Sequence, residues 1–261
     1  AAMQVIARLR EALGVDLPMA ALFDAPTVAG LAAAAAGARA GGDFPPVVPL
    51  PRGGDFPLSF SQERVWFVQA LAPDNRAYHF QASLSLRGAL DAAALRRSLG
   101  DVVRRHEVLR TRFPEVDGRP VQRIHDRMEV PLPVVDLSGV PASLRAEAAR
   151  RCMAALFARP FDLARLPLIR WTLLRLAPDE HLLVHVEHHI IHDGWSLNLL
   201  LRDLVAAYRA RVAGEPPALP APEVQFADYA RWQREWAASP VAEAQREFWR
   251  RTLAGSPPLL E

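Results

Sequence analysis

Apolar positions near the start of the chain are spaced for a helix. Between residues 1 and 37 they are separated by one, three and four residues, which predicts two helices. Gly14 ends the first helix and Thr27 begins the second. From 38 to 56 the chain is rich in Gly, Ala and Pro, as is typical of a linker. We therefore expect a small all-helical unit at 1–37, a linker at 38–56 and a main body at 57–261.

In the main body the hydrophobic period changes repeatedly between that of a strand and that of a helix. Alternating or short continuous apolar runs predict strands at 80–86, 109–113, 121–124, 168–176 and 181–188. Asp117-Gly118 is a hairpin turn between the second and third of these strands. Helical spacing predicts helices at 91–105, 141–157, 195–213 and 226–253. This alternation of strands and helices predicts an α/β fold with a mixed sheet and flanking helices.

Composition and charge exclude several classes of protein. The 31 basic and 29 acidic residues are interspersed and leave a net charge of +2, which does not favour nucleic acid or a membrane surface as a partner. Apolar runs stay below the ~18 residues of a membrane span, and the start of the chain lacks a signal-peptide pattern. Cys152 is the single cysteine, so a disulfide within the chain is excluded. These features predict a cytoplasmic protein.

Ionisable residues are concentrated at 188–194, with the sequence His-His-Ile-Ile-His-Asp-Gly, between an expected strand and an expected helix. Burying imidazoles costs desolvation energy, so such a position requires a reason. His188 and His189 are expected to point to opposite faces of the strand, and so cannot share one role. Taken alone, such a pair is more often structural than catalytic. A metal site is disfavoured because the sequence has no His-Glu-x-x-His helix and no cysteine pair.

Four motifs together resemble one protein family. Residues 188–194 resemble the HHxxxDG signature of the condensation domains of non-ribosomal peptide synthetases, with His192 in place of the usual Ser. Three other motifs of this family occur in the same order along the chain, at 59–67, 105–113 and 226–233. The resemblance implies the N-terminal lobe of a two-lobed, chloramphenicol-acetyltransferase-like fold.

The start of the chain resembles a different domain of the same synthetases. Residues 22–31 are similar to a motif near the end of a peptidyl carrier domain, whose cofactor is 4'-phosphopantetheine. The family's attachment serine precedes this region and is not in the chain. We therefore expect a piece of a longer protein, consisting of a truncated carrier domain and one condensation lobe. On its own, this piece is expected to have little or no condensation activity.

The resemblance implies the chemistry of amide bond formation. An acyl or peptidyl thioester on an upstream carrier is attacked by the amine of an aminoacyl thioester on a downstream carrier. His189 is expected to face the reaction channel, either as the general base or as the group that positions the amine. His188 is expected to pack against the core and shape the backbone beside His189. No covalent acyl-enzyme is implied.

Other residues of the motif are implied to support the site. Asp193 is expected to be structural and held by an arginine salt bridge, with Arg105 as the first candidate partner and Arg64 as the second. Gly194 is expected to allow a tight turn. Trp195 starts the following helix and is expected to support the site from there.

The implied partners are the upstream and downstream carrier domains, the second condensation lobe and the adenylation domain of the same synthetase. Two other functions remain open within this fold. One is a starter-type acyltransferase, and the other is a non-catalytic platform on which carrier domains dock.

Overall fold

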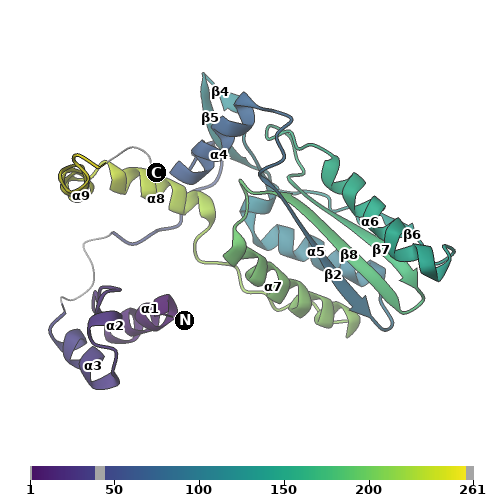
Figure 1. The fold of residues 1–261 in the computed structure, drawn as a ribbon, viewed down its shortest axis with the longest axis horizontal. Helices are drawn as coiled ribbons and strands as arrows, with labels where there is room; N and C mark the ends of the chain where they lie inside the picture. Colours follow the sequence, from purple (N-terminus) through teal and green to yellow (C-terminus); the bar gives the residue numbers. More distant parts are fainter. Residues whose placement is uncertain (1, 39–44, 257–261) are drawn as a thin grey trace. The chain divides into compact units, whose positions relative to one another are not determined.

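The computed structural model describes residues 2–38 and 45–256 (Figure 1). Part of the expected linker, 39–44, lies outside the described residues, as do residue 1 and the end of the expected main body, 257–261. The chain divides into two compact units, one formed by Ala1–Pro46 with Glu235–Glu261 and the other by Val47–Arg234. None of the described helices is long and apolar enough to cross a membrane.

The N-terminal segment is helical, as the spacing of its apolar residues predicts. Its helices are α1 (Ala2–Leu13), α2 (Ala21–Asp24) and α3 (Val28–Ala36), of which α2 was not expected. Gly14 follows α1 with φ of 63°, a conformation that glycine adopts without strain. Thr27 caps α3 because its hydroxyl accepts a hydrogen bond from the Gly30 N–H.

The second unit is built around a mixed four-stranded sheet, which confirms the expected sheet type. Its strands lie in the order β2 (His79–Arg87), β8 (Glu180–His188), β7 (Ile169–Ala177) and β6 (Val134–Asp136). The strands β2 and β7 both run antiparallel to β8, and the unexpected β6 runs parallel to β7. The central strand β8 is therefore paired along both edges, and its end is fixed between two neighbouring strands.

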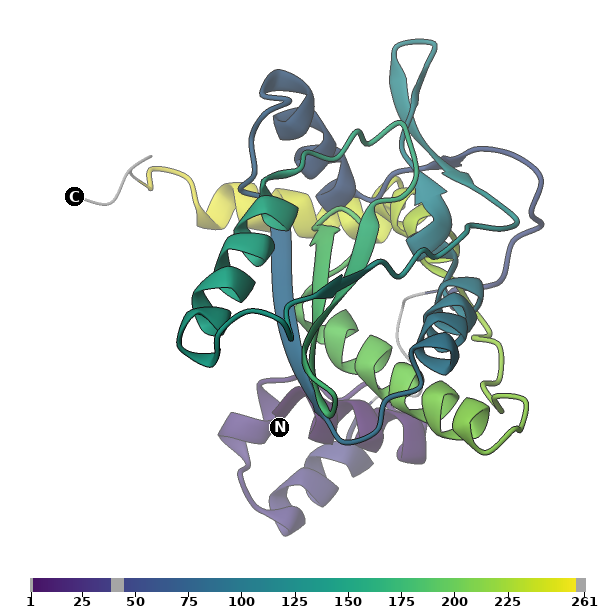
Figure 2. The same cartoon turned by 90° about the vertical axis from the view of Figure 1, so that its right-hand side faces the viewer.

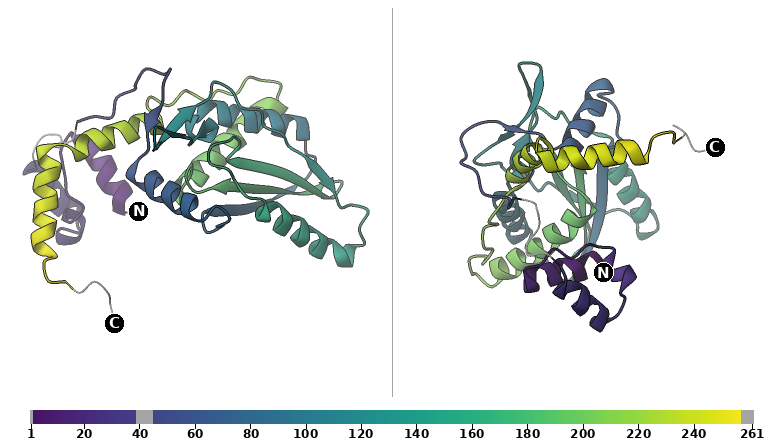
Figure 3. Two further views of the ribbon diagram at one scale, coloured as in Figure 1. Left: turned by 90° about the horizontal axis from the view of Figure 1, so that it is seen from above. Right: turned by 90° about the vertical axis from the view of Figure 1, so that its left-hand side faces the viewer.

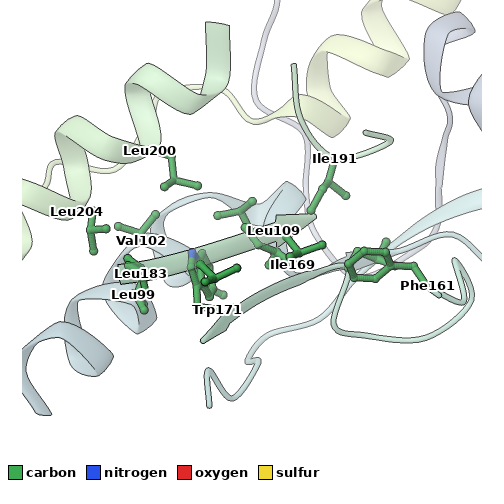
Figure 4. Close-up of a cluster of buried hydrophobic side chains, with 14 of the residues drawn as sticks. Leu99, Val102, Leu109, Phe161, Ile169, Trp171, Leu183, Ile191, Leu200 and Leu204 are labelled. Atoms are coloured by element: carbon green, nitrogen blue, oxygen red, sulfur yellow. The ribbon is translucent and has the colours of Figure 1, made fainter. Parts of the chain in front are cut away.

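Helices cover both faces of this sheet, with α5 (Ala92–Arg105) and α7 (Gly194–Val212) on one side and α6 (Ala142–Ala158) on the other (Figure 2). The side chain of Asp91 caps α5 by accepting from the Ala94 N–H at 2.8 Å. Figure 4 shows buried side chains of the core, among which Leu99 of α5 and Leu204 of α7 lie on the side of Trp171 and Leu183 of the sheet. This core holds α7 against the end of β8 from which it starts.

A smaller sheet lies beside the first. Its central strand β5 (Arg119–Ile124) pairs with β1 (Phe56–Pro57), β3 (Thr111–Arg112) and β4 (Glu115–Val116). The expected hairpin is confirmed, with Asp117 and Gly118 both at positive φ in the turn between β4 and β5. Leu109, which was expected in a strand, instead belongs to the 3₁₀ helix η1 (Glu107–Arg110).

The helix α4 (Phe60–Leu71) covers most of the first motif and was not expected from the apolar pattern. A capping box opens it: the Ser59 side chain accepts from the Gln62 N–H, and the Gln62 side chain accepts from the Ser59 N–H. Polar residues of this motif therefore begin a helix, and their side chains are used by its first turn.

The expected helix at 226–253 is wrong as a single element, because the chain forms α8 (Phe226–Ala237) and α9 (Pro240–Thr252) (Figure 3). The break comes at Ser239, which has an extended backbone and caps α9 through the Ala242 N–H. Pro240 lacks an N–H and disfavours a helical conformation at the residue before it, so one helix ends and another begins there.

Candidate active site

The HHxxxDG motif forms the turn that connects the buried strand β8 to the helix α7. Strand pairing ends at His188, opposite His79 of β2, and the helix begins at Gly194. The main-chain N–H of His189 donates to the carbonyl of Tyr78 at 2.8 Å, and the N–H of Ile191 donates to the carbonyl of His188 at 3.2 Å. These bonds hold a short turn whose residues are presented at the end of the sheet.

His188 is completely buried, and both of its ring nitrogens are used within the protein. Nδ1 accepts from the Ile190 N–H at 3.2 Å, and Nε2 lies 3.2 Å from Gln69 Oε1. Because the Gln69 amide nitrogen donates to the Pro73 carbonyl, its oxygen faces His188, and Nε2 carries the proton. Burial above all, with repulsion from the His79 and His189 charges, lowers the pKa of His188 to about 3. This imidazole is therefore neutral and has no free lone pair for a substrate.

His189 differs from its neighbour because it lies beyond the end of the strand. Its side chain is exposed and lines an open cavity of about 670 Å³. Its Nδ1 lies 2.8 Å from the main-chain carbonyl of His192. Since a carbonyl can only accept, Nδ1 carries the proton and the lone pair of the neutral ring is on Nε2. The two histidines thus have different surroundings. They differ because the strand ends at His188, and not because successive residues of a strand point to opposite faces.

Asp193 is the N-cap of α7 and is not held by an arginine. Its Oδ1 accepts from the Ser196 N–H at 2.9 Å and from the Ser196 hydroxyl at 2.6 Å. Burial opposes ionisation, but these hydrogen bonds outweigh it and hold the pKa of Asp193 below its ordinary value. Among residues 2–38 and 45–256 no ion pair involves Asp193, so the expected salt bridge is wrong.

Neither arginine expected beside Asp193 is paired with it. Arg105 Nε lies 2.9 Å from Asp203 Oδ2 on α7, and the same oxygen contacts His106 Nε2 at 2.8 Å. Arg64 is exposed on α4 and has no ion pair with any described residue. The second motif therefore ties the end of α5 to α7. It supports the turn through the helix and not through Asp193.

The structure also differs from the expected roles of Gly194 and Trp195. Gly194 is the first residue of α7 and does not have a positive φ. A Cβ at Gly194 would meet no described atom within 4 Å, so no tight turn or close approach requires glycine there. Trp195 is 59% exposed and does not contribute to the buried core of the described residues.

Three buried residues in or next to the motif, His185, Glu187 and His192, have contacts that the sequence pattern did not predict. Glu187 is fully buried on β8, and its carboxylate lies between His185 and His192. The available signal was an acidic residue two positions after His185, which places both on one face of a strand whose neighbouring residues 182–184 and 186 are apolar. Across the described part of the chain, no group of three or more His, Cys, Asp or Glu residues is arranged to hold a metal ion.

The cavity at His189 brings together residues of all four motifs, with Val108 from the second. Its wall includes Ser61 and Gln62 from the first motif, and Phe226 and Tyr229 from the fourth. The buried Gln62 amide also donates to the Ile190 carbonyl at 3.2 Å, so α4 supports the turn directly. A second cavity of about 630 Å³ beside α6 is lined by no residue of the four motifs.

Two further motif residues anchor the segment that precedes β1. Arg52 contacts Glu107 of the second motif at 2.8 Å and Asp228 of the fourth motif at 2.7 Å. Asp228 also accepts from the Leu50 N–H at 3.0 Å. These carboxylates therefore fix the end of the expected linker to the second unit.

Comparison with known families agrees with the four motifs. The model of the condensation domain matches residues 53–261, and the model of the phosphopantetheine attachment site matches residues 1–35. One of the linear gramicidin synthase proteins of Brevibacillus parabrevis is 42% identical over 259 residues, which are 99% of this chain and 5% of that protein. The chain therefore spans a small part of the curated relative that it matches.

Solved structures of the same family have the same fold. The X-domain of teicoplanin biosynthesis, solved with OxyB, has a TM-score of 0.70 at 34% identity and covers 84% of this chain and 48% of its own. The first condensation domain of the calcium-dependent antibiotic synthetase has a TM-score of 0.70 at 28% identity, with coverages of 80% and 50%. The expected chloramphenicol-acetyltransferase-like fold is confirmed. By its family matches, its relatives and its fold, the chain belongs to the condensation-domain family of the non-ribosomal peptide synthetases.

Proposed function

We propose that the synthetase containing this chain uses it to form amide bonds between carrier-bound thioesters. The observation that carries this proposal is the state of His189. Its Nδ1 is committed to a main-chain carbonyl, and its Nε2 carries the lone pair beside an open cavity. An imidazole in this state can accept a proton or a hydrogen bond from an amine near neutral pH.

In the proposed reaction the neutral amine of the acceptor attacks the thioester carbonyl of the donor. A C–N bond forms, the C–S bond breaks, and the amine proton is lost while the thiolate leaves and is protonated. His189 Nε2 either accepts the amine proton or holds the amine in line for attack. His188 keeps the turn in place and takes no proton, and Asp193 keeps the start of α7 in place. The transfer is direct, without an acyl-enzyme.

The substrates are proposed to arrive on the 4'-phosphopantetheine arms of carrier domains. Residues 1–37 contain no serine, so the attachment point of such an arm is not among them. A cavity of about 670 Å³ is of the size that binds small molecules, and its open shape is compatible with an extended arm. The arm supplies an activated thioester; the chain's residues supply orientation and the proton acceptor.

The proposed partners are the upstream and downstream carrier domains, a second condensation lobe and an adenylation domain of the same synthetase. We place this assembly in the cytoplasm, and its product among antibiotics and related secondary metabolites. Division of the chain at residues 37 and 56 into carrier, linker and condensation lobe is part of the same proposal.

The test is the rate of product formation on the acceptor carrier, followed by mass spectrometry in the synthetase module that contains this chain. His189→Ala is expected to reduce the rate by roughly 10² to 10⁴-fold, as for other general bases, without loss of fold. The matched control is His125→Ala, because His125 follows β5 of the smaller sheet and does not line the cavity. A His189→Ala variant with the wild-type rate would exclude the proposed role.

The same assay separates the two other functions. A starter-type acyltransferase would accept a free or carrier-bound fatty acyl donor in preference to an aminoacyl or peptidyl donor. A docking platform would bind loaded carriers, and His189→Ala would leave both binding and product formation unchanged.

A further inference from the structure

A buried carboxylate lies directly beneath the turn that carries His189. Glu187 is the residue before His188 on the central strand β8, where it pairs with Phe80 of β2 and Ile169 of β7. Its side chain is fully buried. An ionised carboxylate at such a position is costly unless close partners compensate for the lost water.

The partners of Glu187 are two imidazoles and no arginine among the described residues. Oε1 lies 2.5 Å from His192 Nδ1, and Oε2 lies 3.2 Å from His185 Nε2. Burial alone would raise the pKa of Glu187, but the contacts with His185 and His192 outweigh it and hold the pKa below the ordinary value. The carboxylate is therefore ionised and holds both rings.

The ring of His192 is fixed from several sides. Its side chain is 2% exposed, and its ring centroid lies 5.3 Å from that of Phe80 and 6.5 Å from that of His185. A ring held in this way also fixes the main chain of its own residue, because few torsions separate the two. The carbonyl of His192 is the group that accepts from His189 Nδ1 at 2.8 Å.

These contacts form a continuous path from Glu187 through the His192 ring and main chain to His189. We propose that Glu187 and His192 are a positioning pair for the reactive imidazole. The pair holds the His192 carbonyl in place, and this carbonyl fixes the ring orientation of His189 and keeps its lone pair on Nε2. This proposal rests on the proposed function of His189 and names the residues that prepare it.

His185 provides a matched comparison within the same cluster. It contacts the other oxygen of Glu187 and is also buried on β8, but among the described residues no hydrogen bond joins it to the turn of His189. Loss of His185 therefore removes a buried partner of Glu187 and one ring neighbour of His192, but it leaves the path of carboxylate, ring and carbonyl in place. If the cluster had only a structural role, loss of the Glu187 contact with His185 and loss of its contact with His192 would have similar effects on activity.

The experiment compares Glu187→Gln with His185→Gln in the synthetase module, by steady-state kinetics and by ¹⁵N NMR of labelled histidine, which reports the tautomer of each ring. Glu187→Gln is expected to lower kcat by roughly 10 to 100-fold through misplacement of the imidazole, with KM for the loaded carriers unchanged within about 2-fold. The His189 signals are expected to change from the Nδ1–H tautomer to a mixture. His185→Gln is expected to keep that tautomer and to change kcat by less than about 3-fold.

A second variant covers the case in which Glu187→Gln does not fold. Glu187→Leu combined with His192→Ser replaces the whole buried pair, a change that is often tolerated because no unpaired charge remains. It is expected to show the same loss of kcat and the same mixture of tautomers. Wild-type kcat and an unchanged His189 tautomer in either folded variant would overturn the proposal, as would equal effects of Glu187→Gln and His185→Gln.

The two proposals fail in different ways. If His189→Ala retains the wild-type rate, the function proposed for His189 fails, whatever its tautomer. If His189→Ala is inactive but Glu187→Gln leaves kcat and tautomer unchanged, only the positioning role of Glu187 and His192 fails.

Discussion

The end of β8 and the start of α7 contain the same kinds of ionisable side chain in opposite environments. On β8, Glu187 and His188 are fully buried, and each contacts two protein groups. At the start of α7, Asp193 is exposed, and its side-chain oxygen is bound to Ser196. Between them, His189 is exposed and has one ring nitrogen without a partner among the described residues.

This contrast shows how one short motif divides its residues between the proposed chemistry and structural support. His188 and Glu187 are buried with close contacts inside the protein, and burial keeps the His188 ring neutral, so both can hold the turn but cannot take part in turnover. Because His189 is exposed, its second ring nitrogen can still form a hydrogen bond. The orientation of its ring then depends on the buried groups next to it. The comparison predicts that substitutions in β8 reduce stability strongly and that those at the start of α7 do so weakly.

The largest expected loss of stability is for His188→Ala. The substitution removes a buried ring with hydrogen bonds at both nitrogens, and it leaves Ile190 N–H and the Gln69 oxygen unpaired. We expect a fall of about 3 kcal/mol in the free energy of unfolding, measured by urea denaturation. His189→Ala, adjacent in sequence, is expected to change it by less than about 0.5 kcal/mol. Equal losses for the two variants would remove the distinction between them.

Stability is expected to decrease with falling pH because His188 is held neutral. Its pKa is about 3 in the folded chain against the ordinary 6.5, so below 6.5 the unfolded chain binds a proton that the folded chain does not. The loss is about 1.4 kcal/mol per pH unit for this group, or about 2 kcal/mol between pH 6.5 and 5. Burial lowers the pKa of His79 too and adds to the loss.

Glu187 contributes in a lower range of pH. Its folded pKa is below the ordinary 4.5, so its stabilisation is present above that value and is lost as the pH falls through the folded pKa. Urea denaturation at several pH values checks both effects. A folded His188→Gln variant is expected to have a shallower pH dependence between 6.5 and 5, and an unchanged slope would contradict the assignment to His188.

Much of the fold could be predicted from the sequence because local signals and tertiary packing agree. The strands β7 and β8 contain apolar runs bounded by a polar turn, and α5 begins at a good N-cap, Asp91, so their positions were predicted closely. The helix α4 was missed because its capping residues, Ser59 and Gln62, are polar and its apolar pattern is weak. β6 has only three residues and depends on pairing with β7, which a local pattern does not indicate.

The candidate site could be located but not built from the sequence. The motif indicated where His188 and His189 lie, but not the partner of each nitrogen. These partners include Gln69, which is 119 residues away from His188 along the chain. Arg105 was assigned to the wrong carboxylate because its partner, Asp203, lies further along α7, the helix that Asp193 caps, and is close only after α5 packs on α7. Contacts of this kind depend on packing between distant segments and have no local signal.

A smaller effect is expected at Asp193, where exposure limits the loss. Asp193→Ala removes the N-cap of α7 and is expected to destabilise the fold by about 1 kcal/mol. Asp193→Asn keeps a side-chain oxygen that can accept from Ser196 N–H, and is expected to stay within about 0.5 kcal/mol of the wild type. Thermal unfolding and the product assay check both. A folded Asn variant that loses activity sharply would show that the charge of Asp193 acts on the substrate.

The smallest expected effect is for Gly194→Ala, which tests whether the start of α7 lacks a side chain for structural reasons. Its φ is not positive, and the added Cβ would meet no described atom within 4 Å. Because alanine restricts the unfolded chain more than glycine does, the variant is expected to gain about 0.5 kcal/mol of stability, measured by thermal unfolding. If the variant is this stable but its rate of product formation falls sharply, the space over Gly194 is needed by the bound thioester. Glycine at this position would then be explained by the substrate and not by the fold.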